Sequence, residues 1–412
     1  MQRPGSQPRL IVPDLARGLA LAGIAMANAT QAWMYNGFDD PDVPGSSLGG
    51  LREGSATDQF AAVFSALFVH VRGLPMFSTL LGFGIGLIAA SLFRKQYPLR
   101  DARRVIVRRY GFLALFGLIH MFGLFFGDIM FFYGLIGMLL ATMFTLSNTS
   151  LRMIAYGVLS LFTLLGTVLA VAVYFFELPI DEALRPSNPE LTNIIDYFSA
   201  NAFAGLFTLI AAPVSVIQLG SLAIIGYIWA REGYLVNVDA HRGMLWRWVI
   251  FGSVVAVGTG LPWGLSAIGV INPFTEPAWA VLSQSWGLFT GPAILAAIAL
   301  ATNRIQEQMH ANGGIAPAWT YPFVALGKRS MSGYLAQSFL FIAIAMPFGL
   351  GVGLEASISG KLLTGLGIWL ITLLLATVME KAGIPGPFEQ VHRRLSYGKT
   401  GRLEPYELPK SQ

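Results

Sequence analysis

The chain has 412 residues, of which 54% are hydrophobic and only 12% are charged. Soluble domains carry about twice that share of charged residues, so the composition predicts an integral membrane protein. The absence of cysteine excludes disulfides, thiolate catalysis and cysteine-bound metal ions. A net charge of +5 would suit nucleic acid, but the basic residues sort to one side of the predicted membrane. We therefore expect no nucleic-acid partner.

The first apolar run, residues 11–34, fits either a membrane span or a cleaved secretory signal. Basic residues precede it, and Ala27-Asn28-Ala29 has the small-x-small pattern of a cleavage site. Asp14 and Arg17 lie in its first turns, where charges suit the buried polar face of a helix better than a removable apolar segment. We therefore interpret this run as the first transmembrane helix.

Apolar windows of the length that a bilayer requires recur along the whole chain. We predict about ten transmembrane helices, over residues 11–34, 73–93, 110–126, 129–146, 153–176, 202–230, 244–270, 279–302, 322–348 and 361–380. The segment 56–69 is apolar but short, which is typical of an interfacial or re-entrant helix leading into the second span. The sequence thus predicts an all-α, polytopic protein with a single transmembrane domain over residues 1–412. We detect no internal repeat, so an inverted-repeat transporter has no sequence support.

The charge pattern predicts the orientation of the chain. With the N-terminus inside, most of the 27 lysines and arginines fall in inner loops or at inner helix ends, and the densest run is Arg94–Arg109. The exceptions are Arg17, Arg52, Arg72, Arg185 and Lys361. The positive-inside rule therefore places both termini in the cytoplasm. The basic run either orients the protein and contacts anionic lipid, or holds the phosphates of a nucleotide-bearing donor such as coenzyme A.

Polar residues inside the first span are candidates for pairing or binding. Asp14 and Arg17 are three residues apart and share a helix face, so they can form a structural ion pair that lowers the cost of both charges. Asn28 lies about four turns further along the same helix. An amide at that depth bonds either to a neighbouring helix or to a substrate.

His120 and Asp128 form the strongest candidate site. A charge near the bilayer centre costs at least ~2.5 kcal/mol, so such residues usually mark a pathway or a site. In a continuous helix the two side chains would be ~12 Å apart, and a kink or a substrate would be needed to join them. His120 is a candidate general base, because imidazole takes up and returns a proton near neutral pH. The alternatives are a neutral histidine bonded between helices and, for Asp128, a helix cap.

Arg72 precedes the second span, beside His70, at the predicted outer surface. Its guanidinium is either a clamp for an anion or a carboxylate, or a side chain that snorkels to the water.

Several short motifs follow one another along the chain. They are Asp14–Gly18 with Gly23-Ile24 and Asn28, Met76–Ser78 with Leu81–Gly84, Gly117–His120 with Gly127–Ile129 and Tyr133, Gly327–Ser338, and Gly386–Glu389. Together they resemble the YeiB-like family of bacterial membrane proteins, whose C-terminal half is the domain of unknown function four-eighteen. The resemblance covers most of the chain.

The resemblance implies an activity and a location. Residues 1–240 are similar to transmembrane acyltransferases of the heparan-glucosaminide acetyltransferase type, and residues 241–412 are the family-specific part. This implies a protein of the bacterial cytoplasmic membrane that moves an acyl group from a cytoplasmic acyl-CoA to an acceptor across the membrane. Those transferases have their catalytic histidine in the loop after the first helix, where this chain has Asn36, Asp39 and Asp40. The role of base would therefore fall to His120.

Our leading hypothesis is a transmembrane acyltransferase with His120 and Asp128 as its catalytic residues. The expected substrate-binding residues are Asn28, Arg72, Tyr133, Tyr334 and Gln337. We expect no bound cofactor and no metal ion. Acyl-CoA would be a substrate, and membrane lipids and a lipid or glycan acceptor would be partners. The sequence is compatible with a homo-oligomer.

Two other functions compete with acyl transfer. A transporter or lipid exporter would use the same polar residues to line a path, and a scaffold would use them for packing. Cavities open from both faces and meeting at His120 would favour transfer. A single occluded cavity at mid-membrane would favour transport.

Overall fold

The computed structural model describes residues 10–176, 178, 191, 193–311 and 316–406. Over these residues the secondary structure is helical throughout. The helices are α1 Ile11–Asn28, α2 Ala56–Phe68, α3 Gly73–Arg94, α4 Leu99–Gly123, α5 Met130–Thr142, α6 Asn148–Phe176, α8 Ile194–Glu232, α9 Arg242–Val255, α10 Leu261–Ala267, α11 Glu276–Trp286, α12 Thr290–Ala311, α13 Tyr321–Lys328, α14 Ser330–Ala345, α15 Ile358–Lys381 and α16 Pro387–Tyr397.

The helices agree with a multi-pass membrane protein. In the described residues, eight helical stretches are long and apolar enough to cross a bilayer, and α5 and α14 are shorter apolar helices. Each predicted window therefore contains helix, and the protein is a polytopic all-α membrane protein. Some boundaries differ from the prediction. The helix predicted over 110–126 begins at Leu99, because its arginine-rich first half is itself a good helix former. The window 322–348 contains two helices, which are separated at Arg329.

The short apolar segment before the second span is a separate helix, as the sequence predicted. α2 ends at Phe68, and Val71 has a positive φ of 55° before α3 begins. Arg72 stabilises this break, since its Nε donates to the carbonyl of Leu67 at 2.9 Å and its Nη2 to that of Ala66 at 3.2 Å. The guanidinium thus satisfies carbonyls that the end of a helix leaves without partners.

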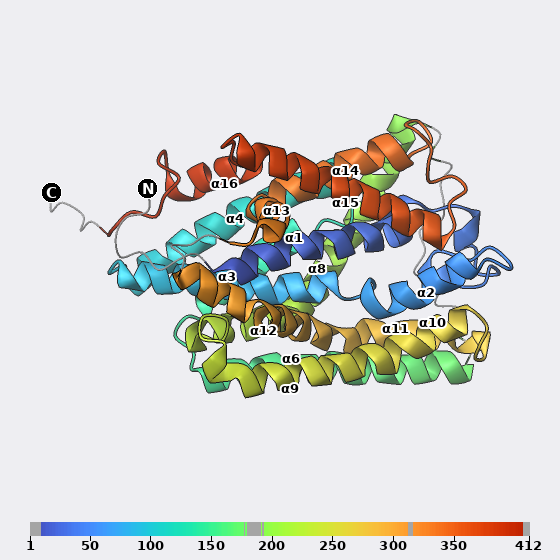
Figure 1. Cartoon of the computed structure of the whole chain (residues 1–412), viewed down its shortest axis with the longest axis horizontal. Helices are drawn as coiled ribbons and strands as arrows, with labels where there is room; N and C mark the ends of the chain where they lie inside the picture. The colour runs from blue at the N-terminus through green and yellow to red at the C-terminus, as the bar shows by residue number, and fades with distance from the viewer. Residues whose placement is uncertain (1–9, 177, 179–190, 192, 312–315, 407–412) are drawn as a thin grey trace.

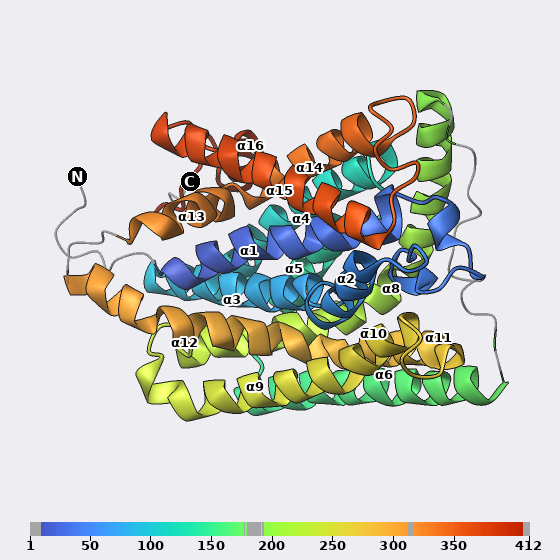
Figure 2. The same ribbon diagram turned by 45° about the vertical axis from the view of Figure 1, so that its right-hand side comes forward.

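Most of the long helices run along the long axis of the molecule, with α1 in the middle (Figures 1 and 2). α1 packs against α3, α12, α13, α14 and α15, and α9 and α6 lie in an outer layer against α12 and α11. Glycines permit the closest crossings. A Cβ added at Gly82 of α3 would lie 1.7 Å from the carbonyl oxygen of Ala223 in α8. The two helix backbones therefore touch, as small residues allow inside membranes.

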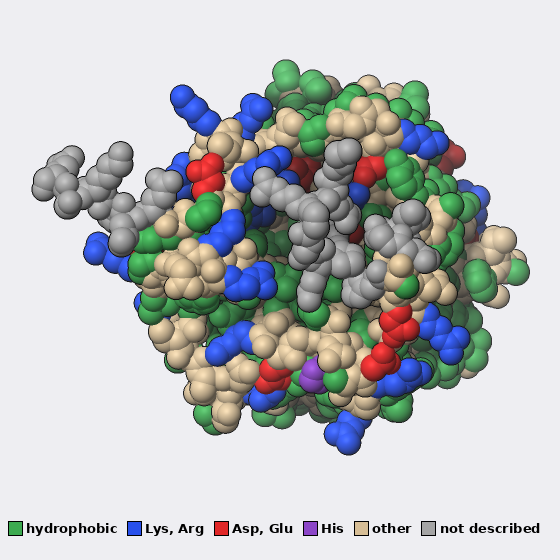
Figure 3. Space-filling view, turned by 60° about the vertical axis from the view of Figure 1, so that its left-hand side comes forward, with side chains coloured by type: hydrophobic (Ala, Val, Ile, Leu, Met, Phe, Trp, Pro, Cys, Tyr) green, Lys and Arg blue, Asp and Glu red, His purple; other side chains and the backbone are tan. Residues whose placement is uncertain are grey.

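The two ends of the bundle differ in charge. The chain enters α1 and leaves α16 at the same end, where α3 ends and α4 begins (Figure 1). Lysine and arginine side chains are spread over this end, which we call the basic end (Figure 3). It includes Arg94 and the arginines of the first half of α4. We call the opposite end, where α1 ends, the far end.

Candidate functional site

His120 and Asp128 are in direct contact. α4 ends at Gly123 and α5 begins at Met130, so the chain turns back between them. This turn brings the Oδ2 of Asp128 to 2.7 Å from the Nδ1 of His120. The axial separation expected for a continuous helix therefore does not apply, and a break joins the two side chains without a substrate. The other oxygen of Asp128 accepts a hydrogen bond from the backbone N–H of Phe131 at 2.7 Å. Asp128 thus both orients His120 and caps α5.

The third member of the site is Ser338 of α14, which the sequence analysis placed in a motif but did not name as a functional residue. Its Oγ lies 2.9 Å from the Nε2 of His120. All three side chains are buried, with exposed fractions of 2% for His120, 0% for Asp128 and 2% for Ser338. A carboxylate can only accept, so Asp128 holds the ring proton on Nδ1 and leaves Nε2 free to accept from the serine hydroxyl. We call these three hydrogen-bonded side chains the Ser338–His120–Asp128 relay.

Tyr334 and Tyr133 lie next to the relay. The Tyr334 ring centroid is 5.3 Å from that of His120, and its hydroxyl donates to the carbonyl of Gly127 at 3.4 Å. The Tyr133 hydroxyl donates to the carbonyl of Leu74 and lies 3.3 Å from the Oγ of Ser78. The Tyr334 hydroxyl is thus held at the turn that carries Asp128, and the Tyr133 hydroxyl at the first turns of α3.

Gln337, a further predicted substrate-binding residue, is engaged with the neighbouring helix α1. It is buried, and its Nε2 donates to the carbonyl of Leu21 in α1 at 3.3 Å. This bond joins α14 to α1 one residue before Ser338. The contact is the interhelical kind that amides commonly make in membranes.

A cavity of about 180 Å³ opens beside the relay towards the basic end, and we call it the basic-end cavity. Tyr133, Tyr334, Ile129 and Met130 line its inner part. Its charged lining residues are Asp14, Arg17, Arg109, Lys328, Glu389 and Arg393.

One of the carboxylates in this cavity is committed to helix packing. Glu389 of α16 accepts hydrogen bonds from the backbone N–H groups of Met331 at 2.8 Å and Ser332 at 3.2 Å, and from the Ser332 hydroxyl at 2.6 Å. It caps the first turn of α14 and so joins the two C-terminal motifs, Gly327–Ser338 and Gly386–Glu389, in space. Four cationic side chains and two carboxylates line the cavity, so positive charge predominates there.

The predicted Asp14–Arg17 contact is present, at 3.4 Å between Oδ1 and Nη1. The Asp14 side chain is 3% exposed, whereas that of Arg17 is 27% exposed. The pair is thus buried on its acidic side only. Arg17 faces the basic-end cavity.

A second cavity, of about 570 Å³, lies on the other side of the same turn, and we call it the far-end cavity. Asn28 and Arg72 both line it, together with the amide side chains Gln31, Gln218 and Gln284. Gly127 and Ile129 form its inner wall. Because Ile129 lines both cavities, the turn that carries Asp128 separates them.

Arg72 and its neighbour His70 are buried inside the protein. His70 is 0% and Arg72 is 4% exposed, and the side of the membrane on which they lie stays a prediction. Arg72 is drawn inward because the end of α2 offers it carbonyl acceptors. The His70 ring packs against Trp263 at 5.3 Å, and its nitrogens have no hydrogen-bond partner among the described residues. Arg72 therefore caps the end of α2 and also lines the far-end cavity.

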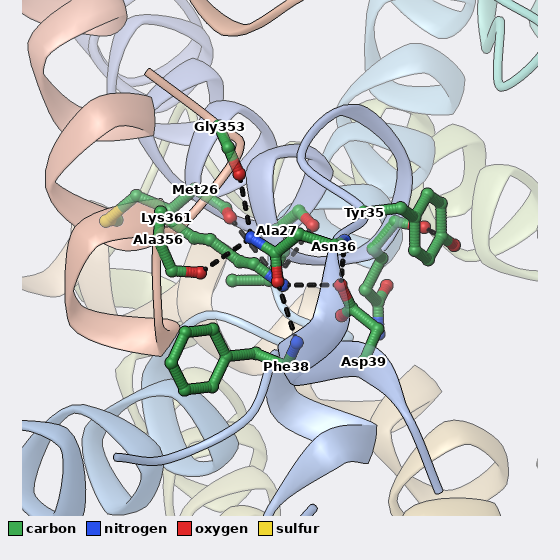
Figure 4. A network of polar contacts seen from close by, with 11 residues as sticks. Met26, Ala27, Tyr35, Asn36, Phe38, Asp39, Gly353, Ala356 and Lys361 are labelled. Atoms are coloured by element: carbon green, nitrogen blue, oxygen red, sulfur yellow. Dashed lines mark hydrogen bonds and ion pairs between the residues drawn. The ribbon is translucent and has the colours of Figure 1, made fainter. Parts of the chain in front are cut away.

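The loop after α1 is structural in this chain. Asn36 donates from Nδ2 to the carbonyls of Gly353 at 2.7 Å and Ala356 at 2.9 Å (Figure 4). Asp39 forms a 2.7 Å ion pair with the Nζ of Lys361. Lys361 is 0% exposed, so the ion pair is buried inside the protein. These contacts tie the loop to the start of α15 and place it away from the relay residues of α4 and α14.

Comparison with known proteins relates the chain to proteins without a described activity. Residues 229–399 match the family model described as "Protein of unknown function (DUF418)". This confirms the expected resemblance of the C-terminal part. The chain is also 24% identical over 431 residues to "Uncharacterized protein YxaH" of Bacillus subtilis (strain 168), and the alignment covers 94% of each chain. The family match contains Ser338, whereas His120 and Asp128 lie before it.

Proposed function

We propose that this protein is an acyltransferase of the bacterial cytoplasmic membrane, which moves an acyl group from a donor at the basic end to an acceptor at the far end. The observation that carries the proposal is the buried Ser338–His120–Asp128 relay at the turn between two cavities that extend in opposite directions. A nucleophile, a base and a group that orients the base form the general pattern of acyl transfer.

The first half of the reaction acylates Ser338. The Oγ of Ser338 gives its proton to the Nε2 of His120 and attacks the carbonyl carbon of a thioester donor. The carbon–sulfur bond breaks, and the departing thiol takes the proton from His120. Asp128 keeps the imidazole in the required tautomer and stabilises the imidazolium that forms in between. The product of this half is an ester on Ser338.

The second half transfers the acyl group to the acceptor. A hydroxyl or amine of the acceptor gives its proton to the Nε2 of His120 and attacks the ester carbonyl. The bond from the carbonyl carbon to Oγ breaks, and Ser338 recovers its proton from His120. No electrons are exchanged with an oxidant or reductant. Asn28 and Arg72, which line the far-end cavity, would hold the acceptor and the developing oxyanion.

The charges of the basic-end cavity support an anionic donor. Arg17, Arg109 and Arg393 line it, and Glu389 is engaged with α14. Guanidinium groups bind phosphate oxygens in a bidentate manner, which suits a phosphate-bearing thioester such as acyl-CoA. The phenols Tyr133 and Tyr334 lie between these charges and the relay, where the thioester would be placed.

A transporter would use the same two cavities in a different way, and an acylated serine separates the two functions. Purified protein in lipid nanodiscs is incubated with radiolabelled acyl-CoA and no acceptor, and the labelled residue is identified by mass spectrometry. We expect label on Ser338 in the parent and none in Ser338→Ala. Ser221→Ala is the matched control, because Ser221 is also a buried serine, and its hydroxyl bonds to the carbonyl of Gln218 in its own helix.

The outcomes of this experiment are decisive. Label on Ser338 that is lost in Ser338→Ala and kept in Ser221→Ala supports the transferase. A parent that stays unlabelled without an acceptor but yields acylated product once a cell-envelope extract is added would replace the covalent step by direct attack of the acceptor, with His120 as base. An unlabelled parent that yields no acylated product in vitro or in cell-envelope extracts would overturn acyl transfer and favour transport or a scaffold.

A further inference from the structure

A third cavity, of about 400 Å³, lies at the far end between the end of α1, α8 and the end of α14. Its lining includes Trp33, Phe125, Ala204, Ala345 and Leu354. Small-molecule sites usually measure about 300 to 1,000 Å³, so this cavity is large enough to hold a ligand. The proposed donor and acceptor sites do not use it. We call it the apolar cavity.

The polar side chains around this cavity are engaged elsewhere. Asn201 donates from Nδ2 to the carbonyl of Met121 at 2.9 Å and accepts from the N–H of Phe126 at 2.6 Å. The Tyr197 hydroxyl donates to the carbonyl of Leu124. These bonds satisfy backbone groups where α4 ends, and the remaining wall is mostly hydrocarbon and aromatic. Apolar cavities exclude water and accept apolar ligands, so a sugar or a free phosphate would find few partners here.

An aromatic layer separates the apolar cavity from the relay. Trp33 stacks on Phe125 with 4.7 Å between ring centroids and on Phe341 with 5.2 Å. Phe125 also packs edge-on against His120, with 6.3 Å between centroids. One ring is therefore in contact with the proposed base on one side and lines the cavity on the other.

α14 points from the relay to the cavity. Ser338 and Ala345 are seven residues apart on this helix, so they lie on the same face and ~10 Å apart along the axis. Ala345 lines the cavity. A chain attached to the Oγ of Ser338 that follows α14 towards the far end would therefore enter it once the Phe125 ring turns aside.

We propose that the apolar cavity binds the aliphatic chain of the transferred acyl group, so that the substrate class is a fatty acyl thioester. The identity of the chain as a transferred group rests on the proposed function, whereas the binding of a hydrocarbon chain does not. The cavity then limits the length of the acyl chain, because burial of each further methylene strengthens binding only while the chain still fits.

The binding test uses a substitution in the wall of the apolar cavity that fills part of its volume. Ala204→Trp places an indole in the cavity, and Leu206→Trp on the same helix is the control, because Leu206 is 49% exposed on the outside of the bundle. Both variants and the parent are reconstituted in nanodiscs with a palmitic acid analogue that carries a diazirine near its methyl end. Peptides that become crosslinked on illumination are identified by mass spectrometry. We expect crosslinks at Phe126 and Leu354 to fall roughly tenfold or more in Ala204→Trp and to persist in the control.

A transfer test connects binding to the reaction. Parent and Ala204→Trp are compared with palmitoyl and acetyl thioesters, and we expect the ratio of palmitoyl to acetyl transfer to fall roughly tenfold or more in the variant. The short acetyl group does not reach the cavity, so its transfer serves as the internal control for folding.

The outcomes separate this proposal from the proposed function. Equal crosslinking in the parent and Ala204→Trp, or an unchanged ratio of palmitoyl to acetyl transfer, would overturn the chain site and leave acyl transfer standing. Crosslinks that depend on the cavity, in a protein that transfers neither acyl group, would overturn the transferase together with this role of the cavity. In that case the site would be a binding site for membrane hydrocarbon alone.

Discussion

The hydrogen bonds of Asp128 predict what happens when its charge is removed. One carboxylate oxygen accepts from the N–H of Phe131 and the other from the Nδ1–H of His120, both at 2.7 Å. In Asp128→Asn a single oxygen remains, and it stays on the backbone N–H if the cap is kept. The new NH₂ group then faces Nδ1, which must accept. The ring proton moves to Nε2, so His120 donates to Ser338 and cannot take its proton.

This tautomer change sets the size of the effect. Loss of a general base lowers a rate by about 10² to 10⁴, which corresponds to ~2.7–5.4 kcal/mol at ~1.36 kcal/mol per tenfold. Stability should change much less. A lost helix cap costs about 0.5 to 2 kcal/mol, and here the bond to Phe131 is retained. We therefore expect Asp128→Asn to fold like the parent and to acylate Ser338 at least about a hundredfold more slowly.

The assay measures the rate of acyl-Ser338 formation from a labelled thioester donor, together with the melting temperature. Asp101→Asn is the matched control, because this substitution removes the same charge from the first turn of α4. Asp101 pairs there with Arg104 at 3.6 Å. A rate for Asp128→Asn within about threefold of the parent, with equal amounts of folded protein, would refute the tautomer argument. A lowered melting temperature without a specific loss of rate would make Asp128 a helix cap only.

The remaining predictions concern stability and topology. Lys361→Met should lower the free energy of unfolding by ~3–5 kcal/mol, because it leaves Asp39 as an uncompensated buried charge, and Lys361→Met combined with Asp39→Leu should recover much of the loss. Thermal melting of the parent and the two variants tests this, and a double variant no more stable than the single one would contradict it. Burial lowers the pKa of His392 in α16 to about 4, whereas the unfolded value is about 6.5. The stabilisation from the neutral ring is thus present above about pH 6.5 and is lost as the pH falls towards 4. Amide hydrogen exchange in α16 should therefore speed up over that range in the parent and change little with pH in His392→Gln. An equal pH response of exchange in His392→Gln would contradict this. Both termini are predicted to be cytoplasmic, so in intact cells an impermeant thiol reagent should label Glu53→Cys at the far end and not Lys399→Cys near the C-terminus; the reverse pattern would invert the topology.

The sequence determined the fold class and the positions of the apolar helices. A run of about twenty apolar residues has to be helical in a bilayer, since its backbone groups find no water to bond. The break at Gly127-Asp128 and the short helix over 56–69 were also visible, because both depend on local composition. The same local rule indicated His120 and Asp128, since an ionisable residue in an apolar run is costly unless it has a partner or a function.

Other features were decided by the tertiary structure. The fold buries Arg72, whose guanidinium donates to carbonyls at the end of α2, and Lys361, whose partner Asp39 lies 322 residues away along the chain. Ser338 lies 218 residues from His120 along the chain, and a serine in an apolar helix carries no signal that separates it from packing. Its role in the candidate site depends on how α14 is rotated about its axis and on where α4 ends. Those quantities follow from the packing of helices distant in sequence, which no local pattern of residues specifies.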